Sequence, residues 1–158
     1  QELLFPGSSQ VKQKFTIQYA AYHDREVLSW PGASVLPLPV LHPSGSSSFA
    51  LRITTEGKII AYSGDTEWTE RLIEAAHGAD LFICEATLPA SYEEEASHGH
   101  MTSRQAGETA ARAGAKKLVL THIWPTFDVV DIAREAGETY GGEVLPAREG
   151  MTISLGGG

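Results

Sequence analysis

The chain has 158 residues, of which 42% are hydrophobic and 20% charged, and its formal net charge is −8. This length and composition are those of one folded domain with an apolar core, and no apolar run reaches the roughly 18 residues that a membrane span needs. The acidic charge argues against non-specific binding to nucleic acid, because phosphate contacts need clustered Lys and Arg. The single cysteine, Cys84, cannot form an internal disulfide, so we expect a reducing, cytoplasmic setting.

The first part of the chain has the patterns of strands. Residues 3–7 have the pattern of a strand end followed by a Pro-Gly turn. Alternating or continuous apolar residues then predict strands over 15–20, 35–41, 49–54 and 58–62. Pro37 and Pro39 interrupt the strand predicted over 35–41, so we expect an edge or irregular strand there. Glu56-Gly57 predicts a hairpin turn between the last two.

From Glu67 onward, helical and strand patterns alternate. Apolar residues at helical spacing predict helices over 67–77, 103–113 and 129–137. Short apolar runs predict strands over 81–84, 117–120, 144–147 and 151–155. Asp65 or Thr66 is expected to cap the first helix, and Thr102 the second. The alternation predicts an α/β fold, with residues 1–158 as a single domain.

Four polar side chains stand just after predicted strands: His42, Asp65, Glu85 and His122. In open α/β sheets, the carboxyl ends of the strands form the edge at which ligands bind. Imidazole and carboxylate are ligands of zinc, iron and manganese, and a carboxylate can bridge two metal ions about 3.5–4 Å apart. Each residue alone has a structural alternative, which is a helix cap for Asp65 and a hydrogen-bonded core position for each histidine.

A second polar cluster, His98-Gly99-His100-Met101-Thr102, directly precedes the helix predicted over 103–113. A helix N-terminus carries partial positive charge and free N–H groups, so a polar group there can face an anionic ligand. Histidine titrates near neutral pH and can give a proton to a leaving group. The alternative is a solvent-exposed loop in which Thr102 is an ordinary cap.

Three further features have simple structural interpretations. Cys84 lies in an apolar strand and is expected as a small core residue, and Glu93–Glu95 as part of a solvated loop. Trp124-Pro125 follows His122 closely and either lines a pocket or packs in the core.

Five stretches of the chain carry a resemblance when they are taken in order. They are Val40-Leu41-His42-Pro43 with Phe49–Ile53, Tyr62-Ser63-Gly64-Asp65-Thr66, Cys84-Glu85-Ala86-Thr87, His100-Met101-Thr102 with Gln105-Ala106, and Leu120-Thr121-His122. Together they resemble the metallo-β-lactamase superfamily, and within it the phosphodiesterase branch typified by ribonuclease Z. The similarity spans nearly the whole chain. It implies an αββα sandwich, of which this chain is the C-terminal part.

The resemblance also implies a role for each matching residue. His42 is similar to the third histidine of the first metal site, Asp65 to the carboxylate that bridges both metals, and His122 to a ligand of the second metal. His100 is similar to the histidine that protonates the leaving oxygen, and Glu85 to the carboxylate that orients and polarises it. Two divalent ions are therefore expected, with zinc as the first choice and manganese or iron as alternatives.

The sequence departs from the family in one respect, because the His-x-His-x-Asp-His motif is absent. The opening Leu3–Gly7 resembles a segment that normally follows this motif, so we expect a longer enzyme of which this chain holds three metal ligands. We expect the chain alone to bind metal poorly. The arm that some tRNA-processing members use is also missing, since Arg52 reaches Asp65 through one short hairpin. The short hairpin and the acidic charge argue against tRNA as substrate.

The leading hypothesis is a binuclear-metal phosphodiesterase that acts on a small, anionic, nucleotide-like phosphodiester, with no membrane partner. The first alternative, within the same superfamily, is hydrolysis of a lactone, thioester or other acyl substrate. The second is a non-catalytic half-domain that associates with itself through an exposed sheet face. The resemblance also suggests a homodimer.

Overall fold

The computed structural model describes residue 16 and residues 19–156. In this part of the chain, seven strands form one sheet in the order β1-β2-β3-β4-β5-β6-β7. The strands are β1 (Leu28–Trp30), β2 (Ala33–Val40), β3 (Ser48–Thr55), β4 (Lys58–Tyr62), β5 (Leu81–Glu85), β6 (Lys117–Thr121) and β7 (Glu143–Pro146). Neighbours from β1 to β4 are antiparallel, and neighbours from β4 to β7 are parallel.

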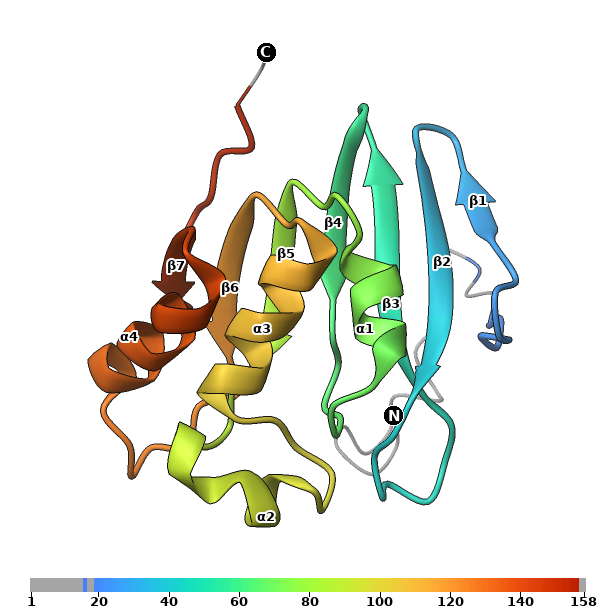
Figure 1. Cartoon of the computed structure of the whole chain (residues 1–158). Helices are drawn as coiled ribbons and strands as arrows, with labels where there is room; N and C mark the ends of the chain where they lie inside the picture. Colours follow the sequence, from blue (N-terminus) through green and yellow to red (C-terminus); the bar gives the residue numbers. More distant parts are fainter. Residues whose placement is uncertain (1–15, 17–18, 157–158) are drawn as a thin grey trace, which may run out of the picture.

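The main helices all lie on one face of this sheet (Figure 1). They are α1 (Glu70–Ala76), α3 (Ser103–Ala113) and α4 (Val129–Tyr140), and each belongs to the connection between two parallel strands. A single turn, η2 (Ala90–Tyr92), and the short α2 (Glu93–Ala96) precede α3 at one end of the sheet. Among the described residues, no helix is both long enough and apolar enough to cross a bilayer.

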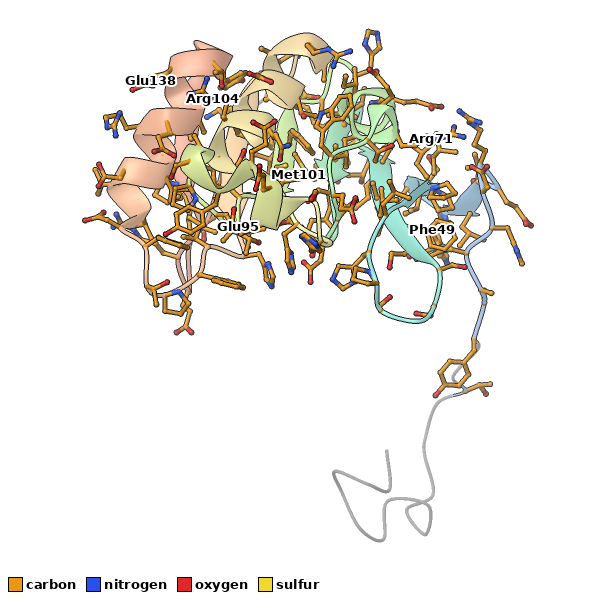
Figure 2. The ribbon with its side chains drawn as sticks, turned by 60° about the horizontal axis from the view of Figure 1, so that its bottom comes forward. Phe49, Arg71, Glu95, Met101, Arg104 and Glu138 are labelled. Carbon is orange, nitrogen blue, oxygen red and sulfur yellow. The ribbon has the colours of Figure 1, made fainter. Side chains whose placement is uncertain are left out.

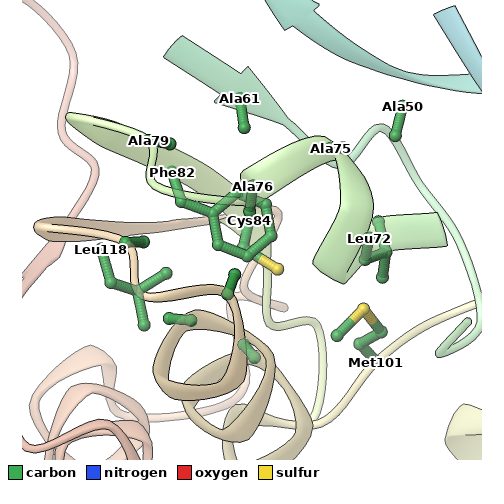
Figure 3. Packing of buried hydrophobic residues seen from close by; sticks show 14 of the residues in the cluster. Ala50, Ala61, Leu72, Ala75, Ala76, Ala79, Phe82, Cys84, Met101 and Leu118 are labelled. Carbon is green, nitrogen blue, oxygen red and sulfur yellow. The ribbon is translucent and has the colours of Figure 1, made fainter. Parts of the chain in front are cut away.

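The core fills the space between the sheet and the helices. Phe82 and Leu118 from the sheet and Leu72 of α1 are fully buried in one cluster (Figure 3). Leu38 of β2 and the alanines of α3 belong to the same cluster. Burial of one such large side chain stabilises a fold by about 1.5–3 kcal/mol. Cys84 is also fully buried in this cluster, which confirms its prediction as a core residue.

The opposite face of the sheet is apolar as well. Leu51, Tyr62 and Ile83 are in register across β3, β4 and β5, and they alternate with core residues such as Ala61. A sheet that is apolar on both faces is typical of a layer inside a sandwich. One sheet with one helical layer is therefore the arrangement expected of the C-terminal part of an αββα fold.

The β3–β4 hairpin and the prolines of β2 follow local rules. Glu56 and Gly57 have φ angles of 49° and 72°, as a two-residue hairpin turn requires, so this prediction is confirmed. β2 lies between β1 and β3 and is not an edge strand at its start. Its pairing with β1 ends at Val35, so Pro37 and Pro39 pair only with β3 and their missing N–H groups remove no bond to β1.

The first helix begins later than predicted, at Glu70, and neither Asp65 nor Thr66 caps it. Its cap is Thr69, whose hydroxyl accepts a hydrogen bond from the Arg71 amide. The Thr66 hydroxyl instead accepts a bond from the Leu41 amide, at 3.1 Å, so the chain after β4 runs along β2 before the helix starts. The local cap signal was overridden by this tertiary contact.

Other boundaries differ in smaller ways. The helix at 103–113 agrees with its prediction, whereas α4 runs three residues further than expected, to Tyr140, because Gly141 at φ 72° ends it. Residues 151–155 form no strand, 93–95 belong to α2 rather than to a loop, and β1 was not predicted. The strands expected over 3–7 and 15–20 lie outside the described residues, apart from residues 16, 19 and 20, which are not in a strand.

Candidate metal centre

The carboxyl ends of β2, β4, β5 and β6 lie at the same edge of the sheet, because these four strands run in one direction. Each is followed by, or ends at, one of the predicted residues: His42, Asp65, Glu85 and His122. His100 comes to the same edge from the loop before α3. Figure 2 turns this edge toward the viewer, and Met101 marks the His100 loop there.

Glu85 is the centre of the hydrogen-bond network at this edge, and it is completely buried. Its Oε1 accepts from the Thr66 amide at 2.6 Å and lies 3.3 Å from Nδ1 of His100. Its Oε2 accepts from the Thr87 hydroxyl at 2.7 Å and from the Met101 amide at 3.0 Å. A buried carboxylate is stable only with such partners, so Glu85 fixes three separate segments around itself.

Thr87 links Glu85 to His122 and determines which ring nitrogen of His122 is free. Its hydroxyl oxygen lies 2.7 Å from Oε2 of Glu85 and 2.8 Å from Nδ1 of His122. The single hydroxyl hydrogen goes to the carboxylate, which can only accept, so the hydroxyl accepts from Nδ1–H of His122. This network assigns the tautomer in which Nε2 carries no hydrogen and is free to bind a metal.

The free Nε2 of His122 faces Asp65, with 3.7 Å between it and Oδ2 of the carboxylate. Both side chains are 40% exposed, so an ion from solvent has access to them. Ligand distances of about 2.0–2.2 Å, usual for zinc with imidazole and carboxylate, allow one ion to contact both atoms. Donor type, distance and access therefore fit a divalent metal.

The three histidines of the edge form a row. The ring of His100 lies edge-on to His42, with centroids 5.6 Å apart, and is stacked on His122 at 5.2 Å. His42 therefore joins the group through its contact with His100. His122 has a φ of 57°, a left-handed conformation that is uncommon outside glycine and is often found at functional sites.

Gly99 allows the His100 loop to lie against His42. It is buried, with a φ of 111°, and a Cβ at this position would be 2.5 Å from Cδ of Pro43 and 3.4 Å from Cδ2 of His42. Only glycine fits this conformation and this spacing.

A purely geometric criterion for metal ligands selects a slightly different set. Glu85, His100 and His122 each offer a ligand atom, and these atoms lie within 4.8 Å of one another. Glu85, however, already has four hydrogen-bond partners and no exposed surface. Asp65 and His122 keep ligand atoms that are open to solvent, and their role as metal ligands stays a prediction.

The electrostatic field at the edge is negative. Burial, followed by the carboxylates of Asp65 and Glu85, raises the pKa of Tyr62 above its ordinary value of 10.0. The phenol therefore stays neutral at physiological pH. A negative field with free imidazole and carboxylate atoms favours a cation at this position.

Sequence reasoning missed the roles of Thr87 and Gly99. Thr87 gave a weak signal as a polar residue two positions after Glu85, beyond the end of an apolar strand. Trp124 was noted, and its amide donates to the Thr87 carbonyl at 3.3 Å while 48% of the residue is exposed. It lies beside the site and is not a core residue.

A mixed sheet with helices on one face, and with imidazole and carboxylate groups at the carboxyl ends of its strands, is the architecture of metallo-hydrolases of the β-lactamase type. The family described as the beta-lactamase superfamily domain matches residues 8–123. The chain belongs to this superfamily.

Known proteins with similar sequences or structures point the same way. Rv1339 of Mycobacterium tuberculosis is 38% identical over 122 residues, which cover 77% of this chain and 44% of that protein. A ribonuclease Z of Haloarcula marismortui is 34% identical over 140 residues, 85% of this chain and 41% of the enzyme. The crystal structure of the metallo-β-lactamase fold protein YhfI from Bacillus subtilis has a TM-score of 0.78 at 28% identity. That match covers 95% of this chain and 61% of YhfI.

The chain spans less than half the length of these two sequence relatives. The matches establish the fold and the superfamily of this chain. Because the chain is only part of the length of these relatives, the reaction of the whole protein is a matter for proposal.

Proposed function

We propose that the whole protein is a metal-dependent phosphodiesterase that hydrolyses a small, nucleotide-like phosphodiester with the help of two divalent ions. The observation that carries this proposal is the position of His100. Its Nδ1 lies on the buried Glu85 carboxylate at 3.3 Å, its ring is stacked beside His122, and 23% of its side chain is exposed. A histidine held in this way at a metal-type site is arranged to give a proton to a leaving group.

The residues take separate roles in this proposal. Asp65 and His122 would hold one ion, and His42 would help to hold the other. The ions would polarise a phosphoryl oxygen and make water more acidic. Further ligands are expected from a His-x-His-x-Asp-His segment elsewhere in the whole protein.

Protein groups perform the proton transfer. As the doubly protonated imidazolium, His100 would donate Nδ1–H to Glu85 and give the second proton, on Nε2, to the departing alkoxide oxygen. The ring is then neutral and keeps its hydrogen on Nδ1. Glu85 keeps the ring in this orientation because the amides of Thr66 and Met101 hold the carboxylate in place.

Charge and shape support a small substrate. The net charge of −8 disfavours a long polyanion such as tRNA, and the two-residue β3–β4 turn leaves no room for a substrate-gripping arm. A small phosphodiester has one negative charge, which bound cations can balance. Zinc, with manganese or iron as alternatives, a homodimer and a cytoplasmic setting are part of the same proposal.

Replacement of His100 tests this function in the full-length, metal-loaded protein. We expect His100→Ala to lower kcat for a phosphodiester with an alkyl leaving group by about 10²–10⁴-fold while the metal content stays the same. His98→Ala is the matched control, because His98 is exposed in the same loop. Unchanged turnover in His100→Ala would show that His100 is not the acid.

A further inference from the structure

Two loops build the site and are bonded to each other. The first, residues 86–92, carries Thr87 and is called the Thr87 loop; the second, residues 97–102, carries His100 and is called the His100 loop. Leu88 of the first loop accepts a bond from the Ser103 amide at 2.8 Å, just after the second loop. The Leu88 amide in turn donates to the Met101 carbonyl at 3.3 Å. These two bonds hold the loops side by side.

One side chain from outside the loops holds both of them. Glu135, on α4, accepts a bond at its Oε2 from the Ala90 amide at 2.9 Å and from the Ser103 hydroxyl at 2.5 Å. Ala90 lies three residues after Thr87, and Ser103 lies three residues after His100. A single carboxylate oxygen thus bonds α4 to the Thr87 loop and to the residue that directly follows the His100 loop.

Glu135 is free of the surface ion pairs of its helix. The described ion pairs of α4 join Arg134 to Asp131 and Glu138, and none includes Glu135. Its bond to Ser103 joins α4 to the first residue of α3, and Gly107 makes a further contact between these two helices. The half-buried carboxylate therefore links the packed pair of α3 and α4 to the Thr87 loop.

We propose that Glu135 is a positioning residue for proton transfer by His100. Through Ser103 and Ala90 it keeps the two loops, and with them His100 and Thr87, in one arrangement around Glu85. This inference rests on the proposed function, and it adds a residue that touches neither metal nor substrate. Small displacements of a catalytic group are enough to lower its rate contribution strongly.

The role predicts a dependence on the leaving group. An alkoxide is a poor leaving group and needs the proton of His100, whereas nitrophenolate leaves without one. A displaced His100 should therefore slow cleavage of an alkyl phosphodiester and leave cleavage of a nitrophenyl phosphodiester almost unchanged. General loss of folded protein would lower both rates equally, so the ratio separates positioning from instability.

The test compares three variants of the full-length, metal-loaded protein. Glu135→Ala removes both bonds, and Glu135→Gln keeps an amide oxygen that can accept both. Glu138→Ala is the control, because Glu138 is an exposed residue of the same helix. We expect Glu135→Ala to lower kcat for the alkyl diester by about 10–100-fold and for the nitrophenyl diester by less than about threefold, with Glu135→Gln and Glu138→Ala near wild type.

Amide hydrogen exchange gives a second readout that needs no activity. We expect faster exchange in residues 86–103 of Glu135→Ala and no change in Glu138→Ala. Equal losses for both diesters, or unchanged exchange in these loops, would overturn the inference. If the wild-type protein cleaves neither diester, the proposed function fails, and exchange alone then decides whether Glu135 holds the loops.

Discussion

At the scale of single residues, the Thr87 hydroxyl determines the tautomer of His122, the proposed metal ligand. Thr87 has one hydrogen to give and two polar neighbours, Glu85 and His122. Because the carboxylate must accept, the free nitrogen of His122 is the one that faces Asp65. Outer partners of this kind fix the orientation of metal-binding histidines and raise their affinity for the ion.

Thr87→Val tests this arrangement. Valine has nearly the same shape, but it leaves Nδ1 of His122 without a partner and removes one of the four donors to Glu85. We expect metal affinity of the full-length protein to fall by about 10–100-fold, measured by competition with a chromogenic chelator. Thr54→Val, at an exposed position of β3, is the control. Equal affinities for the two variants would mean that Thr87 does not orient the ligand.

Residue chemistry explains what could be predicted at this scale. Histidine and carboxylate side chains at strand ends are candidate ligands by their chemistry, so the sequence could predict that His42, Asp65 and His122 lie at one edge. Their role as metal ligands stays a prediction. Threonine and glycine carry no such signal. Thr87 and Gly99 act through contacts with other strands and loops, which the sequence alone does not reveal.

At the scale of elements, the sequence predicted a helix boundary correctly where the residues that form the boundary are neighbours in the chain. Helix α3 begins with a capping box between Thr102 and Gln105 and ends at Gly114, which has a φ of 65°. Both signals lie within the helix or next to it. The predicted start of α1 was wrong because the Thr66 hydroxyl accepts a bond from the Leu41 amide, which lies 25 residues earlier in the chain.

The contact between α3 and α4 depends on Gly107. A Cβ at this position would lie 2.2 Å from the Ala136 carbonyl oxygen. Alanine gains about 1 kcal/mol of helix preference over glycine, but overpacking against a backbone atom costs about 1–3 kcal/mol. An approach of 2.2 Å to a backbone oxygen places the cost at the upper end of this range, so we expect Gly107→Ala to lower the free energy of unfolding by about 2 kcal/mol in denaturant titrations.

Gly137 provides the matched control for this prediction. A Cβ there would meet only Cγ2 of Val144, at 3.9 Å, which is ordinary contact. Gly137→Ala should therefore stabilise the protein by about 0.4–1 kcal/mol. If both alanine variants stabilise the protein, then α3 and α4 are not packed as closely as described.

Asp80 joins the starts of three parallel strands and makes stability depend on pH. Its carboxylate accepts bonds from Lys116 at 2.8 Å and from the Ile59 amide at 2.9 Å. These bonds, with Lys116 first, lower the pKa of Asp80 below its ordinary value of 3.8. The charge of Asp80 therefore stabilises the protein fully above pH 3.8, and this stabilisation is lost as the pH falls through the lowered pKa of Asp80 in the folded protein.

Asp80→Asn should melt at a lower temperature than wild type at about pH 7, and the difference should close toward about pH 2–3. Thermal unfolding followed by circular dichroism at several pH values measures this. Glu149→Gln, at an exposed carboxylate, is the control and should show no such trend. A difference that stays constant down to the lowest pH would contradict the role of the Asp80 charge.

At the scale of the whole molecule, the site is a product of topology. Four strands that run in one direction bring residues as distant as His42 and His122 to one edge. The parallel direction of the strands after Glu67 could be expected from the alternating pattern of helix and strand. The approach of His100 to Glu85 could be expected only from the resemblance, because a loop of this length can fold in many ways.

We propose that this fold, in the whole protein, uses metal ions to hydrolyse phosphodiesters. The most direct test is the turnover of a nitrophenyl phosphodiester and of a lactone by the full-length protein, before and after metal removal with a chelator. We predict that the diester is the better substrate, that the chelator abolishes its cleavage, and that zinc or manganese restores it. Faster cleavage of the lactone, or diester cleavage that survives complete metal removal, would contradict the claim.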